Sequence, residues 1–176
     1  MPERELQPGA RAARAARARI DRFTDVVGAC TSWVALVIVL LMAANVLLRY
    51  AFSMGTVWAQ ELEWHLLVPL ILFGMSYALR HGEHVRVDIV YSRLSHRAQA
   101  IVDLISALLV VAVSALIIWF SLHYVQQSWV IDEGSPDPGG IPHRYLIKGL
   151  IPVGFALLIL QGIANALGCV EKLKGP

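Results

Sequence analysis

Four long runs of apolar residues alternate with short polar segments along the 176-residue chain. Three of these runs contain no Asp, Glu, Lys or Arg: residues 26–48, 104–123 and 149–168. About 20 consecutive apolar residues match the hydrocarbon thickness of a bilayer, and the core of a water-soluble domain does not need runs of this length. The pattern therefore predicts membrane-spanning helices.

The fourth run is shorter than a bilayer is thick. Residues 66–79 are apolar, but these 14 residues rise only about 21 Å as a helix. Counting back to Gln60 gives 20 residues, so the polar stretch "WAQELEWH" (58–65) is expected to form the outer end of this span. We predict an all-α membrane protein. Its four transmembrane helices are expected at about 26–48, 60–79, 101–123 and 144–168.

The composition agrees with this fold class. Hydrophobic residues make up 57% of the chain and charged residues only 16%, whereas soluble domains carry about a quarter charged residues. No linker is long enough to separate domains. We therefore expect one membrane domain (26–168), preceded by a basic leader (1–25) and followed by a short tail (169–176).

Lysine and arginine are distributed unevenly over the segments between the spans. One side is predicted to carry twelve of them: Arg4, Arg11, Arg14, Arg17, Arg19, Arg22, Arg80, Arg86, Arg93, Arg97, Lys172 and Lys174. The other side carries three: Arg49, Arg144 and Lys148. Because positive loops stay inside, this asymmetry predicts that both termini are cytoplasmic. The basic leader is interpreted as a topology signal that binds anionic headgroups, rather than as a nucleic-acid site or a cleaved signal peptide.

Ionisable side chains are absent from the middle of every predicted span. A carrier coupled to protons or sodium ordinarily needs a charge near the bilayer midplane, so this chain is not expected to transport a solute by itself. The polar side chains of the last span are Gln161 and Asn165, four apart on one helix face. They are expected to bond between helices or to a partner, and solute binding is the alternative.

The stretch "WAQELEWH" places two carboxylates and a histidine at the membrane boundary. Glu61 and Glu63 lie near the N-terminal end of the second span, where the helix dipole favours negative charge. They project from different sides of a helix and so cannot flank one bond as a catalytic pair. His65 is four residues after Glu61 and can contact it.

A haem or quinone-enzyme membrane anchor is the alternative function. His65 and His123 are expected at the same outer depth of neighbouring helices, the arrangement of a bis-histidine haem site. Interfacial hydrogen bonding is the simpler interpretation. His81 and His84 are only weak candidates for a metal site, and the two cysteines, near the cytoplasmic face, do not predict a disulfide.

Two motifs carry a resemblance to a known family. The string "LRHGEHVRVDIVYSRL" is similar to an R-x-G-x-H-v-x-v-D pattern, matched by Arg80, Gly82, His84, Val85, Val87 and Asp88. Upstream, Trp58, Glu61 and Leu62 resemble the W-x-x-E-L entry to the second helix. Both patterns resemble the small membrane subunit of tripartite ATP-independent periplasmic (TRAP) transporters, and the last outer loop is similar to the mannitol or chloroaromatic subgroup.

The resemblance implies a sodium-coupled importer of organic acids in a bacterial inner membrane. A periplasmic binding protein captures the solute, a large membrane subunit transports it, and the small subunit is a fixed scaffold without enzyme activity, cofactor or metal. Gly82 is expected to allow a tight exit from the second span, and His84 to pair with Asp88. The candidates for partner contacts are Trp58, Glu61, His65, Arg80, Gly82, His84, Asp88, Gln161 and Asn165.

Overall fold

The computed structural model describes residues 8–82 and 91–174. Its four long helices are α1 (Pro8–Phe52), α2 (Val57–His81), α4 (His96–Val130) and α5 (Tyr145–Lys174). Each is long and apolar enough to cross a membrane. Within the described residues there is no strand. The all-α fold with four spans is therefore confirmed.

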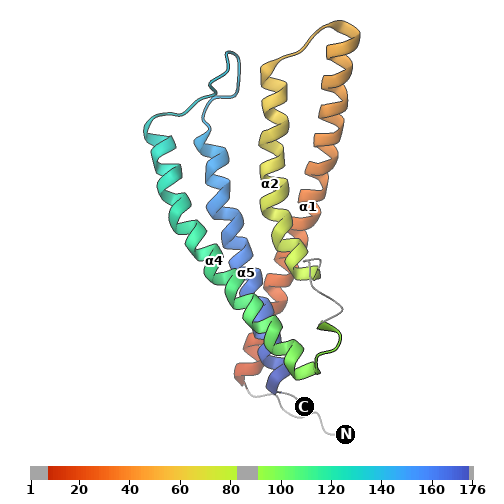
Figure 1. Ribbon diagram of the computed structural model, residues 1–176, viewed down its shortest axis with the longest axis vertical. Coiled ribbons are helices and arrows are strands. Elements are labelled where there is room, and N and C mark those ends of the chain that lie inside the picture. Colours follow the sequence, from red (N-terminus) through yellow and green to blue (C-terminus); the bar gives the residue numbers. More distant parts are fainter. Residues whose placement is uncertain (1–7, 83–90, 175–176) are drawn as a thin grey trace.

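The helices form two antiparallel hairpins, α1 with α2 and α4 with α5 (Figure 1). Helix α5 is the central element, because it contacts all three of the others. The hairpins pack together at the end where α1 begins and α5 ends, and they splay apart toward the two inter-helix connections at the opposite end (Figure 1).

Small residues allow the close approach of α4 and α5. The buried residues of α4 repeat every seven positions: Ala100, Ala107, Ser114, Ser121 and Ser128. On α5, a Cβ added to Gly162 would lie 2.9 Å from Val111 of α4. Without a hydrophobic driving force between helices in lipid, this close backbone packing is what holds them together. This row of small residues on α4 thus faces another helix.

Close packing also joins the other elements. A Cβ added to Gly28 would lie 2.1 Å from the Tyr77 ring, so α1 gives room to an aromatic side chain of α2. A Cβ added to Gly154 of α5 would lie 2.7 Å from Cβ of Leu72 of α2.

All four helices are longer than the predicted spans, and two of the helix starts have local reasons. Helix α1 runs unbroken through residue 25, because the Ala- and Arg-rich leader has high helix propensity. At its 45 residues it is about 68 Å long, far more than one bilayer crossing. Helix α2 begins after Thr56, whose side chain accepts a bond from the Ala59 amide, so a hydroxyl rather than Glu61 or Glu63 caps this helix.

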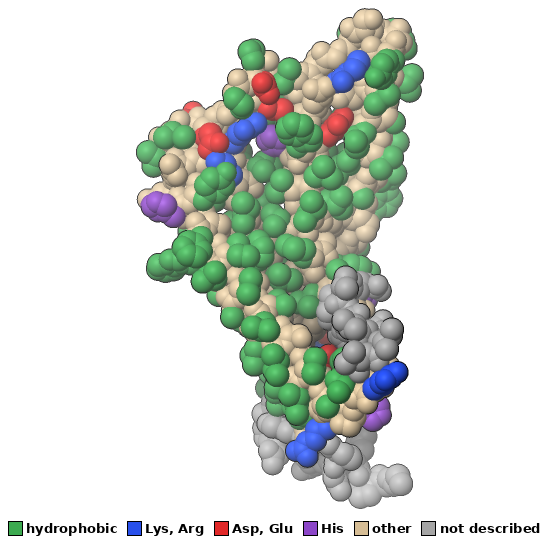
Figure 2. Space-filling view, in the orientation of Figure 1, with side chains coloured by type: hydrophobic (Ala, Val, Ile, Leu, Met, Phe, Trp, Pro, Cys, Tyr) green, Lys and Arg blue, Asp and Glu red, His purple; other side chains and the backbone are tan. Residues whose placement is uncertain are grey.

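Charged side chains gather at the two ends of the molecule, and a band of apolar side chains separates them (Figure 2). On α2 this band is bounded by Glu61 and Arg80, which are 19 residues and therefore about 29 Å apart. This separation matches the hydrocarbon thickness of a bilayer. We call the end that contains Glu61 the loop end, and the end that contains Arg80 the terminal end.

Candidate functional site

At the loop end, Glu61 joins α2 to the connection between α4 and α5. Its side chain is only 4% exposed. The carboxylate accepts a bond from the Ser135 hydroxyl, one from the Ile141 amide at 2.5 Å and one from Nη2 of Arg144 at 3.2 Å. A buried carboxylate with three donors is fully compensated. Glu61 therefore holds residues 131–144 against α2.

The same loop is fixed a second time by Glu133. Its carboxylate accepts a bond from the Lys148 ammonium, which also lies 3.9 Å from the centre of the Tyr124 ring. The bond from Lys148 holds the pKa of Glu133 below its ordinary value. Glu63, by contrast, accepts a bond of 3.0 Å from Nδ2 of Asn45 in α1. Glu61 and Glu63 are thus directed to different parts of the chain, Glu61 to the connection between α4 and α5 and Glu63 to α1.

The two histidines of the alternative haem site, His65 and His123, have different surroundings. His65 lies 2.7 Å from the Glu61 carbonyl oxygen through Nδ1, and its ring borders a mainly apolar cleft beside Arg144 and Lys148. His123 is exposed on α4. Over residues 8–82 and 91–174, no group of three His, Cys, Asp or Glu side chains is placed to hold a metal ion.

At the terminal end, Gln161 is the centre of a polar network. It is completely buried. Its oxygen accepts a 2.8 Å bond from the Thr24 hydroxyl, and its Nε2 donates to Asp21 at 3.0 Å and to Asn165 at 3.1 Å. Asn165 in turn donates to the Leu79 carbonyl at 3.3 Å. The hydrogen bonding predicted for Gln161 and Asn165 therefore joins α5 to both α1 and α2.

Arg80 adds an ion pair between α2 and α1. Its Nη2 lies 2.6 Å from Oδ2 of Asp25, and its Nη1 lies 3.9 Å from Oδ1 of Asp21. His81 lies 3.3 Å from the other oxygen of Asp25. The two aspartates neutralise a cation at the membrane boundary, where an unpaired charge is costly. The guanidinium of Arg80 is thus engaged inside this chain.

The remaining motif residues differ in how they are placed. Gly82 ends α2 with a φ of 75°, and its amide bonds to the Ala78 carbonyl, which confirms the tight exit. Trp58 is exposed in the first turn of α2. His84 and Asp88, with their predicted pairing, lie outside the described residues.

Sequence reasoning missed the partners of Glu61 and the contribution of the leader. The leader contacts had a signal, since Asp21, Thr24, Gly28 and Thr31 recur at helical spacing and form one polar and small face of α1. No sequence signal marked the Glu61 contacts, because the partners of Glu61 lie 74 to 83 positions away along the chain.

Within residues 8–82 and 91–174, hydrogen bonds and ion pairs thus connect the bundle at both of its ends. Comparison with known proteins identifies the family of this chain. A model described as "Tripartite ATP-independent periplasmic transporters, DctQ component" matches residues 38–172, well over half of the chain. The chain belongs to this family. The resemblance found in the two motifs is therefore confirmed, and the DctQ component is a small permease of solute transporters.

Two small permeases of the DctQ family are similar to this chain. The ectoine TRAP transporter small permease protein TeaB of Halomonas elongata is 29% identical over 134 residues, which cover 73% of this chain and 68% of that protein. The C4-dicarboxylate small permease protein DctQ of Vibrio cholerae is 23% identical over 142 residues, 69% of this chain and 61% of that protein.

A third relative contains the DctQ component within a longer chain. The isethionate TRAP transporter permease protein DctMQ of Oleidesulfovibrio alaskensis is 25% identical over 118 residues. These cover 66% of this chain but only 18% of that protein. Small permeases of this family work with a large membrane subunit, and such relatives combine the two in one polypeptide.

Proposed function

We propose that this chain is the fixed small permease subunit of a sodium-coupled TRAP importer for a small organic solute. In this proposal it supports the moving large subunit and helps to receive the periplasmic binding protein. Both termini face the cytoplasm of a bacterial inner membrane, because the terminal end carries most of the lysines and arginines.

The fixed role is supported by where the charged side chains of the bundle lie and by what its buried polar side chains bond to. Between the two charged ends, no Asp, Glu, Lys or Arg occurs in any span. The buried amide of Gln161 is hydrogen-bonded within the chain, because both N–H groups of its Nε2 donate to Asp21 and Asn165 and its oxygen accepts from Thr24. Such a bundle offers packing and rigidity, and the ion and solute sites belong to its partner.

The outward faces of α1 and α4 suit a membrane-embedded partner or lipid. Large apolar side chains on them are strongly exposed, among them Trp33 at 70% and Trp119 at 76%. At the loop end, residues 131–144 are held in one conformation by Glu61 and Glu133. A loop that is ordered before binding costs less entropy when a soluble partner docks on it.

A reversible cross-link between α2 and α5 tests the fixed role. We would replace Leu72 and Gly154 by cysteine, because their Cβ positions are close enough for a disulfide after a small shift. The native Cys30 and Cys169 would be replaced by alanine. The complete transporter, reconstituted with its binding protein, would be assayed for sodium-driven uptake before and after oxidation.

Uptake that is unchanged by complete oxidation of the cysteine pair is the expected result. The two single-cysteine variants, treated with the same oxidant, are the controls. Loss of uptake in the cross-linked pair alone, restored by reduction, would show that α2 and α5 move during transport and would overturn the fixed role.

A further inference from the structure

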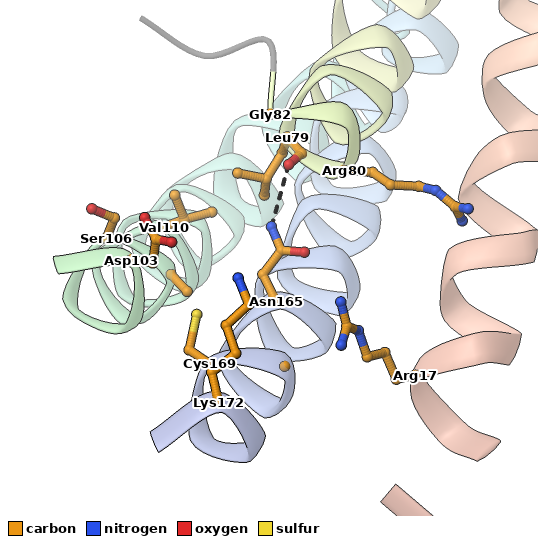
Figure 3. A pocket seen from close by; sticks show the side chains of 12 residues that line it. Arg17, Leu79, Arg80, Gly82, Asp103, Ser106, Val110, Asn165, Cys169 and Lys172 are labelled. Carbon is orange, nitrogen blue, oxygen red and sulfur yellow. Dashed lines mark hydrogen bonds between the residues drawn. The ribbon is translucent and has the colours of Figure 1, made fainter. Parts of the chain in front are cut away.

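A cavity of about 270 Å³ lies at the terminal end, where α2 stops and leaves one face of α5 uncovered (Figure 3). Its apolar lining comes from Leu79, Ala107 and Val110. Its polar lining comes from all four helices and includes Arg17, Asp103, Ser106, Asn165 and Lys172. Since α2 ends here at the boundary of the apolar band, the cavity lies at headgroup depth, with apolar and polar walls side by side.

The side chain of Arg17 reaches this cavity because Gly168 of α5 leaves room for its guanidinium. A Cβ added to Gly168 of α5 would lie 2.6 Å from Nη1 and 3.0 Å from Nη2 of Arg17, so the guanidinium packs directly on the α5 backbone. Its one ion-pair partner among the described residues is Asp21, 3.7 Å from Nε. The two Nη groups donate to no acceptor in residues 8–82 and 91–174. They point toward the cavity from α1 (Figure 3).

Lys172 supplies a second cation from α5. Its side chain extends along the helix toward Asn165, into the cavity (Figure 3). No carboxylate in the described part of the chain pairs with it. Arg80 contributes only its stem, because its guanidinium is directed at α1 (Figure 3). Two cations that pair closely with no carboxylate of residues 8–82 and 91–174 therefore line one cavity.

The opposite wall is acidic and polar. Asp103 of α4 lines the cavity and accepts a bond of 2.9 Å from the Tyr91 hydroxyl, and Ser106 lies one turn further along α4. A second cavity of about 520 Å³ adjoins the first through Asp103 and Lys172 and is lined also by His96 and Arg97. The combined lining has an excess of positive charge, with hydrogen-bond acceptors on one side.

We propose that this cavity binds the headgroup of an anionic glycerophospholipid with hydroxyl groups, of the phosphatidylglycerol type. The single negative charge of the phosphodiester lies between Arg17 and Lys172, whose N–H groups donate to its oxygens. The headgroup hydroxyls donate to Asp103, and the first acyl carbons lie against Leu79 and Val110. A zwitterionic ammonium headgroup lacks the net charge that the cations select, and a free phosphate gains nothing from the apolar wall.

The lipid acts in this proposal as a non-protein link at the terminal end. It connects α1, α4 and α5 below the point at which α2 ends, where protein contacts between α4 and the first hairpin are few. The inference does not depend on the transport role, because it can be tested on the purified chain.

The experiment is native mass spectrometry of the purified full-length chain, released from micelles that contain equal amounts of phosphatidylglycerol, phosphatidylethanolamine and phosphatidylcholine. The expected result is preferential retention of one phosphatidylglycerol. A basic residue near anionic lipid contributes enough to affect binding about fivefold, so Arg17→Gln and Lys172→Gln should each lower retention by about that factor. The matched control is Arg22→Gln, an exposed arginine on the same helix that does not line the cavity.

Gly168→Ala tests the geometry without changing any charge. Alanine favours the helix, and its methyl group displaces only the end of the Arg17 side chain, so the chain should fold while retention falls as in Arg17→Gln. The proposal is overturned if Arg22→Gln lowers retention equally, if phosphatidylethanolamine is retained as well, or if soluble glycerol phosphate at millimolar concentration displaces the lipid. The last outcome would identify a site for free phosphate.

Discussion

The amide of Gln161 should measurably stabilise the contact between α5 and the basic end of α1. The test is the substitution Gln161→Met, which keeps the length of the side chain and removes the amide. Three side-chain bonds are lost, to Thr24, Asp21 and Asn165. Two of these bonds join α5 to α1, and side-chain bonds between membrane helices average about 0.6 kcal/mol, so the expected loss of unfolding free energy is about 1 kcal/mol.

A double-mutant cycle isolates one of these bonds. Thr24→Val removes the hydroxyl that donates to Gln161 at 2.8 Å. We expect the double variant Thr24→Val/Gln161→Met to be more stable than the sum of the single effects predicts, by about 0.6 kcal/mol. The assay is reversible unfolding in mixed micelles with increasing dodecyl sulfate, followed by tryptophan fluorescence.

The chain provides a matched control on the same helix. Thr31 is also buried, but its hydroxyl donates to the Val27 carbonyl of its own helix at 2.7 Å. Thr31→Val should therefore show no coupling to Gln161→Met. Additivity of Thr24→Val and Gln161→Met within about 0.3 kcal/mol, or equal coupling for Thr31→Val, would refute the assignment of this bond.

Three further predictions concern the ends of the bundle. Gly140→Ala should increase hydrogen exchange in residues 131–144, because the new Cβ would lie 2.3 Å from Oγ of Ser135, which bonds to Glu61. The control Gly134→Ala should leave exchange unchanged, because a Cβ at that position meets nothing within 4 Å. The pKa of Glu133 is lowered in the folded chain, so its stabilising effect is complete above the unfolded pKa of about 4.3 and is lost as the pH falls through the lower folded value. Exchange in the same loop should thus rise on acidification, and Glu133→Gln should remove this dependence. Gly82→Val should lower co-purification of the large subunit, because a β-branched residue opposes a φ of 75°, whereas Gly74→Val in the open middle of α2 should leave it unchanged.

Local pattern was enough to predict the helices and one of the turns. The length deficit of residues 66–79 correctly indicated that "WAQELEWH" belongs to a helix, and Gly82 was correctly expected to allow a tight exit from that helix. Both conclusions need only the rise of a helix and the conformational freedom of glycine.

Long-range pairing was beyond such reasoning. That Glu61 binds a loop near Ile141, and that Asp25 binds Arg80, depends on which helices are neighbours and at what depth, and no local pattern encodes either. The leader shows a second limit. Its arginines were interpreted through their charge alone, and the face of α1 that includes Thr24 and contacts α5 was overlooked.

The spacing of the two ion pairs on α2 also affects the lipid around the protein. Glu61 is tied to Arg144 at one end and Arg80 to Asp25 at the other, so α2 cannot tilt relative to α1 and to the α4–α5 connection without breaking a charged contact. A helix held in this way does not adapt to a thinner or thicker bilayer, and the mismatch must be taken up by the acyl chains. The subunit then imposes a ring of lipid about 29 Å thick on its surroundings.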